Sequence, residues 1–130
     1  RNKIITYATN AIGSTYSSSN RFGPSSYDCS GLAYKAYDYA GLAITSVCAA
    51  EQAQELINSG RSTSYGSRTK GDLIFYHLQA VDNGRYLSID HVAIYAGNGY
   101  IIDAGSPGVS KRSDTTFSTG TVKATTVPLY

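Results

Sequence analysis

Cys29 is the residue of this chain best placed to do chemistry. It lies in the sequence Tyr-Asp-Cys-Ser-Gly-Leu at 27–32, between a segment rich in Gly, Ser and Asn and a segment with helical apolar spacing. This pattern predicts a helix that begins at Cys29, with Asp28 as its N-cap. A thiol in the first turn of a helix lies near unpaired backbone N–H groups and the positive end of the helix dipole, which favour the thiolate. Cys29 is therefore a candidate nucleophile. The alternative is a small buried hydrophobic residue, the usual role of a free cysteine.

A cysteine nucleophile needs a base, and the chain contains two histidines, His77 and His91. His77 ends the apolar run at 72–77 and has no acidic residue close to it in sequence, so we interpret it as a solvated residue at a strand end. His91 opens an alternating strand at 91–96. We favour it as the general base, against the alternative of a half-buried histidine bonded to a backbone carbonyl.

A hairpin pattern connects His91 with an acidic residue. The strand at 91–96 is followed by Gly-Asn-Gly at 97–99 and by a second strand at 100–104 that contains Asp103. A two-residue loop would turn Asp103 away from His91, whereas a three-residue loop places both side chains on one face. We expect the three-residue loop, and with it a hydrogen bond between Asp103 and His91.

Three motifs in order, at 28–32, 71–76 and 91–99, closely resemble those of the NlpC/P60 cysteine peptidases, papain-like enzymes of bacterial cell-wall metabolism. The resemblance covers residues 4–103, most of the chain. It implies a catalytic set of Cys29, His91 and Asp103. The third position is more often histidine in this family, but a carboxylate can also accept a hydrogen bond from the imidazole.

The resemblance also implies roles around the catalytic set. Gly13-Ser14-Thr15-Tyr16 is similar to the family's Gly-x-x-Tyr, which implies that Tyr16 lies near the oxyanion. The family's usual Trp-Gly-Gly is replaced here by three serines at 17–19, which changes one pocket wall. Asp28 and Ser30 are implied to flank the substrate, and these roles are compatible with a helix cap and a first-turn hydrogen bond.

The implied reaction is hydrolysis of an amide bond in peptidoglycan stem peptides, usually after D-γ-glutamate, by a Cys-His-Asp thiolate mechanism without a cofactor. Alternatives are an N-acetylmuramoyl-L-alanine amidase or other acyl transfer on the same fold, and a wall-binding module without catalysis. The resemblance places the protein in the cell envelope or outside the cell. It leaves open a housekeeping enzyme, a phage lysin, or an effector with an inhibitor or immunity protein as partner.

Composition limits the other possibilities. With 130 residues, 42% of them hydrophobic, we expect one domain spanning 1–130 that acts as a monomer. The net charge of +2 and the absence of a basic run argue against nucleic acid, and no apolar stretch is long enough to span a membrane. A Cys29–Cys48 disulfide would inactivate the nucleophile. A zinc site built from the cysteines and histidines lacks closely spaced ligand pairs.

The order of elements predicts an α+β fold, with N-terminal helices packed on a C-terminal antiparallel sheet as in papain-like NlpC/P60 domains. We expect loops or irregular segments at 14–27, 62–70 and 105–120. The predicted helices cover 2–12, 29–40 and 48–59, and the predicted strands cover 72–79, 85–89, 91–96, 100–104 and part of 121–128.

Overall fold

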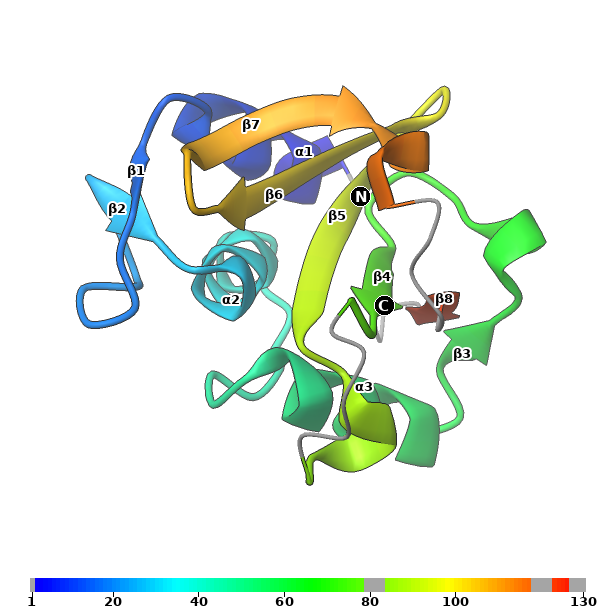
Figure 1. Ribbon diagram of the computed structural model, residues 1–130. Helices are drawn as coiled ribbons and strands as arrows, with labels where there is room; N and C mark the ends of the chain where they lie inside the picture. The colour runs from blue at the N-terminus through cyan, green and yellow to red at the C-terminus, as the bar shows by residue number, and fades with distance from the viewer. Residues whose placement is uncertain (1, 79–83, 118–122, 127–130) are drawn as a thin grey trace.

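The structure is a computed structural model that describes residues 2–78, 84–117 and 123–126. Within these residues, helices come first and one antiparallel sheet follows, as the sequence predicted (Figure 1). The strand order in the sheet is β3-β8-β4-β5-β6-β7. The helices are α1 (Asn2–Ala11), α2 (Cys29–Tyr39) and α3 (Ala49–Asn58), and the sheet strands are β3 (Ser62–Thr63), β4 (Leu73–Tyr76), β5 (His91–Gly97), β6 (Tyr100–Gly105), β7 (Gly108–Ser113) and β8 (Lys123–Thr126).

The core lies between the helices and one face of the sheet. Alternate residues of β5 and β6 pack with α1, α2 and α3, because successive side chains of a strand point to opposite faces. The other face carries a smaller cluster closed by Tyr65 and Phe117. The strand residues that face the helices include Val92, Ile94, Ile102 and Ala104, and those on the opposite face include Ala93, Tyr95 and Ile101.

Buried hydrogen bonds hold α2 in place. The hydroxyl of Tyr37 donates to the carbonyl of Gly71 at 2.7 Å, which ties the helix to the start of β4. At the other end of α2, the buried amide of Gln52 donates to the carbonyls of Ser30 and Thr45, both at 3.0 Å. These contacts fix the first turn of α2, where the candidate nucleophile lies.

The hairpin between β5 and β6 has the expected register but a different turn. Ile94 pairs with Ile102, which places Asp103 on the face of His91. The predicted three-residue loop is wrong, however, because Gly97 pairs with Tyr100 and leaves a two-residue Asn-Gly turn with positive φ at both positions. An irregularity before Gly97 shifts the register by one residue and has the same effect on the side chains as the longer loop.

Two predictions about irregular and extended segments are wrong. The segment 85–89, predicted as a strand, contains a short 3-10 helix (Tyr86–Ser88) in which Leu87 and Ser88 adopt φ of 51° and 54°, values that no strand contains. The segment 105–120, predicted as irregular, contains β7, which pairs with β6 along its whole length. Its polar sequence reflects its position at the edge of the sheet, where alternate side chains face solvent.

The remaining segments agree in part with the predictions. A last strand is confirmed as β8, which pairs with β4 and with β3, an element that the sequence reading of 62–70 missed. The predicted loop at 14–27 contains the short parallel pair β1 (Thr15–Tyr16) and β2 (Ser26–Tyr27). The end of the predicted strand at 72–79, and much of 118–128, lie outside the described residues.

Candidate active site

Cys29 is the first residue of α2, as predicted. Asp28 is the N-cap, and its Oδ1 accepts a hydrogen bond from the backbone N–H of Gly31 at 2.7 Å. The thiol is half-buried and is not part of a disulfide. It lies in the first turn of the helix, where backbone N–H groups have no partners within the helix.

His91 and Asp103 are hydrogen-bonded to each other, from adjacent strands. The Nε2 atom of His91 lies 2.7 Å from Oδ2 of Asp103. Both side chains are buried, and Asp103 is only 1% exposed. The ring of His91 also packs edge-on against Phe117, with the ring centroids 5.2 Å apart. The imidazole is therefore held by one strong hydrogen bond and by aromatic packing.

Arg112 of β7 completes this group, and the sequence reading missed it. Its Nε donates to Oδ1 of Asp103 at 3.0 Å, and its Nη2 donates to Oδ2 at 2.8 Å. Asp103 pairs with Ser110 across the strands, so Arg112, two residues further along, lies on the same face. A prediction of β7 would have identified it. A fork of this kind is the preferred geometry for arginine with a carboxylate.

The charges in this group support one another. Burial of the imidazole opposes its protonation, but hydrogen bonds with Asp103 and Cys29 more than offset this and raise the pKa of His91 to about 9. Because Nε2 is bonded to Asp103, Nδ1 is the nitrogen that faces the thiol. Burial also opposes ionisation of Asp103, yet the hydrogen bonds from His91 and Arg112 keep its pKa below the ordinary value. At neutral pH the site therefore contains an imidazolium beside Cys29 and a carboxylate behind it.

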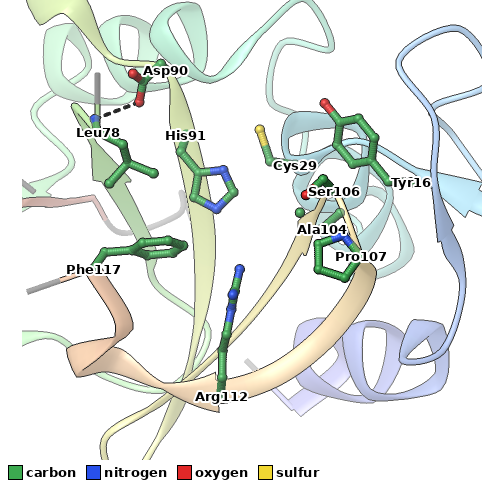
Figure 2. A pocket seen from close by; sticks show the side chains of 11 residues that line it. Tyr16, Cys29, Leu78, Asp90, His91, Ala104, Ser106, Pro107, Arg112 and Phe117 are labelled. Carbon is green, nitrogen blue, oxygen red and sulfur yellow. Dashed lines mark hydrogen bonds between the residues drawn. The ribbon is translucent and has the colours of Figure 1, made fainter. Parts of the chain in front are cut away.

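Two cavities meet at Cys29. The first has a volume of about 560 Å³ and is open to solvent along the side of His91 and Arg112 (Figure 2). The second, of about 320 Å³, lies on the side of Asp28 and does not include His91. Together they form a cleft on either side of the sulfur. Tyr16, Cys29 and Asp90 line both cavities.

Tyr16 lines the cleft together with Cys29, and its implied place near the oxyanion stays a prediction. It belongs to β1, is 43% exposed, and lines both cavities. Partial burial raises the pKa of its hydroxyl, and the nearby Cys29 and Asp28 raise it further. The hydroxyl therefore stays protonated at neutral pH and can donate a hydrogen bond.

Asp28 and Ser30 line the second cavity, but their polar atoms are already engaged by the protein. Oδ2 of Asp28 accepts from Nε of Arg21 at 2.8 Å, while Oδ1 caps the helix. Ser30 is 3% exposed, and its hydroxyl accepts from Nη2 of Arg21 at 2.6 Å. Arg21, which the sequence analysis did not single out, thus organises this wall. It also donates to the carbonyl of Ser46 at 2.6 Å.

The other candidate residues lie apart from the His91 group. His77 is half-buried just beyond the end of β4 and lines neither cavity of the cleft. Cys48 is half-buried, precedes α3 and lines the second cavity without a disulfide to Cys29. In the part of the chain that the structure describes, no group of three or more His, Cys, Asp or Glu residues could hold a metal ion. No helix among the described residues is long and apolar enough to cross a membrane.

The sequence of this chain matches the model of a known protein family. The model of the NlpC/P60 family matches residues 13–126. The chain belongs to the NlpC/P60 family. The match includes the cysteine, histidine and aspartate described above, as well as both walls of the cleft.

Relatives and solved structures agree with this assignment. A probable endopeptidase of Corynebacterium glutamicum is 33% identical over 101 residues, which cover 78% of this chain and 41% of that protein. The chain thus spans less than half the length of this relative. The peptidoglycan hydrolase RipB of Mycobacterium tuberculosis superimposes with a TM-score of 0.76 at 27% identity, over 99% of this chain and 65% of that one. RipD of the same organism, described as a non-catalytic domain adapted to peptidoglycan binding, has a TM-score of 0.73 at 22% identity, over 97% and 95% of the two chains.

Proposed function

We propose that this NlpC/P60 domain is a cysteine peptidase that hydrolyses an amide bond in peptidoglycan stem peptides, the bond after D-γ-glutamate. One observation carries the proposal: His91 is hydrogen-bonded to the buried Asp103 and lines the same cavity as Cys29, which helps to raise its pKa. This is the arrangement that thiolate catalysis requires. The similarity to RipB and to a probable endopeptidase supports the choice of substrate.

The geometry supports a specific course of reaction. The Cys29 thiolate attacks the carbonyl carbon, and the oxyanion accepts hydrogen bonds from the backbone N–H of Cys29 and the hydroxyl of Tyr16. The imidazolium of His91 then gives its proton to the departing amine, and the thioester remains on the sulfur. Water, deprotonated by the now neutral His91, hydrolyses the thioester and restores the thiolate.

In this proposal the second cavity holds the acyl part of the substrate. Asp28 and Ser30 accept hydrogen bonds from Arg21, and all three residues line this cavity. Asp28 and Ser30 act on the substrate chiefly by fixing the position of this wall. Because both carboxylate oxygens of Asp28 are occupied, we assign it first to the helix cap and only second to a contact with substrate. Ser18 lines this cavity next to Tyr16, which is the aromatic side chain among its lining residues.

The same fold also supports other roles. An N-acetylmuramoyl-L-alanine amidase would use the same nucleophile on a different bond. A binding module such as that described for RipD would not need the thiol. The hydrogen bond between His91 and Asp103, beside the thiol of Cys29, favours catalysis over binding alone. Action on the wall would place the protein in the cell envelope or outside the cell.

Digestion of purified muropeptides followed by mass spectrometry tests the proposal. We expect new termini at D-glutamate in products of the wild-type protein. We expect no products from Cys29→Ser or His91→Ala, provided that circular dichroism shows an intact fold. A new N-terminal L-alanine with a freed lactyl group would identify the amidase instead. Full activity of Cys29→Ser would refute the thiolate mechanism.

A further inference from the structure

The position of His91 assigns one cavity to the leaving group, if the proposed function holds. The base must reach the nitrogen of the scissile bond in order to protonate it, so the residue that leaves with the amine lies beside His91. Only the first cavity of the cleft is lined by His91. The leaving residue therefore occupies the cavity of about 560 Å³, and the acyl part occupies the other.

Arg112 is a second positive charge in this leaving-group cavity, besides the imidazolium of His91. Its side chain is 30% exposed, whereas the Asp103 side chain behind it is fully buried. Figure 2 shows the guanidinium rising from β7 into the space between Phe117 and Pro107, below the ring of His91. Its carbon lies 4.9 Å from the centroid of Phe117, so the aromatic ring supports one face of the group.

One edge of the guanidinium remains available to a ligand. Nε and Nη2 donate to the two oxygens of Asp103, and among the described residues nothing accepts a hydrogen bond from Nη1. The carboxylate that lines the cavity, Asp90, lies on the far side of the His91 ring from Arg112 in Figure 2. A ligand that enters this end of the cavity thus meets a cation whose counter-ion is covered by protein.

The distance from this cation to the reacting atoms is short. Oδ2 of Asp103 accepts hydrogen bonds from both His91 and Arg112, so a single oxygen atom bridges the imidazole and the guanidinium. A substrate group that contacts Arg112 therefore belongs to the residue next to the scissile bond. An arginine edge binds carboxylates better than neutral groups, because its N–H bonds to an anion are charge-assisted.

We propose that Arg112 forms a carboxylate subsite that selects substrates whose leaving residue carries a free carboxylate. The carboxylate has two possible sources in a stem peptide. It is either the α-carboxylate of a leaving residue that ends the peptide, or a side-chain carboxylate such as that of diaminopimelate. Both present the same anion to the same guanidinium, and they are separable by experiment.

Two matched pairs of defined stem peptides test the subsite. In the first pair, the residue after D-γ-glutamate is a C-terminal lysine, as the free acid or as the primary amide. In the second pair it is diaminopimelate with an amidated α-carboxyl, its side-chain carboxyl being either free or amidated. We expect kcat/KM to be about tenfold higher for the acid in at least one pair, and the pair that responds identifies the source.

Variants separate this role from the support of Asp103. Arg112→Gln should remove the preference for the acid, whereas Asp103→Asn should slow both members of a pair and leave the acid preferred. Lys111→Gln is the matched control, since it removes the same charge from the adjacent position, where the ammonium lies over Tyr100 and outside the cavity. It should keep the preference.

Binding measurements cover the case in which Arg112→Gln is inactive. Calorimetry measures binding to Cys29→Ala, which cannot cleave the peptides, and to the same protein with Arg112→Gln or Arg112→Lys added. Cys29→Ala should bind the acid more tightly than the amide, and the protein that also carries Arg112→Gln should not. The subsite would be overturned if the wild type had equal kcat/KM and affinity for acid and amide, or if a preference for the acid persisted in Arg112→Gln. If no stem peptide is cleaved, the proposed function fails, while the affinity ratio still decides on the subsite.

Discussion

Replacing Asp103 with asparagine should lower the pKa of His91 from about 9 towards its ordinary value of 6.5. The ring would remain buried, and burial alone favours the neutral imidazole, while the hydrogen bond to a carboxylate would be lost. Arg112 would also lose its anionic partner and would then repel an imidazolium. The change corresponds to about 3 kcal/mol of stabilisation of the imidazolium.

The pH profile of kcat/KM measures this change. In the proposed mechanism the imidazolium is the acid, so activity should fall as the pH rises through the pKa of His91. The alkaline limb of the wild type should lie near pH 9, and that of Asp103→Asn should lie at clearly lower pH.

A matched control removes a carboxylate elsewhere. Asp38 is exposed on α2, and Asp38→Asn should leave the alkaline limb near pH 9. Circular dichroism and the urea midpoint would establish that Asp103→Asn is folded. An alkaline limb that stays near pH 9 in folded Asp103→Asn would refute our account of the site, because the proton would then be held by something other than this carboxylate.

Three further outcomes are expected. The pKa of His91 is raised on folding, so its contribution to stability is present in full below pH 6.5 and is lost as the pH rises through about 9. The melting temperature of the wild type should therefore fall between these pH values. The fall should be smaller in His91→Gln, which lacks the titrating group. Gly105→Ala would place a methyl group 3.2 Å from Nη2 of Arg112 and should lower kcat/KM several-fold, while Gly66→Ala, with open space around it, should not. Tyr37→Phe leaves a buried carbonyl without its hydroxyl donor and should lower the free energy of unfolding by about 1–2 kcal/mol in urea titration.

The parts of the site that follow local rules could be predicted from the sequence. The position of Cys29 follows from its N-cap and from the apolar spacing of α2, and the face of Asp103 follows from strand alternation. The prediction of a three-residue turn was wrong, because a two-residue turn combined with an irregularity before Gly97 gives the same register. Alternation patterns define which side chains share a face more reliably than they define the loop.

The part that could not be predicted depends on an edge strand. β7 is polar because four of its six residues are exposed or partly exposed, and its sequence contains neither an apolar run nor β-branched residues beyond Val109. Arg112 therefore looked like a residue of an irregular loop. Arg21 was missed for a related reason, since its partners Asp28, Ser30 and Ser46 come together only when two loops meet at the start of α2.

Arg112 explains how an aspartate can serve as the third residue of this site. A neutral side chain could orient the imidazole without adding charge, whereas Asp103 places an anion where almost no water reaches it. Burial alone would favour the protonated carboxylic acid, which cannot stabilise an imidazolium. The two hydrogen bonds from Arg112 offset that cost and keep the carboxylate ionised. Asp103 and Arg112 therefore act as one unit, and a change at either position should alter the protonation of His91.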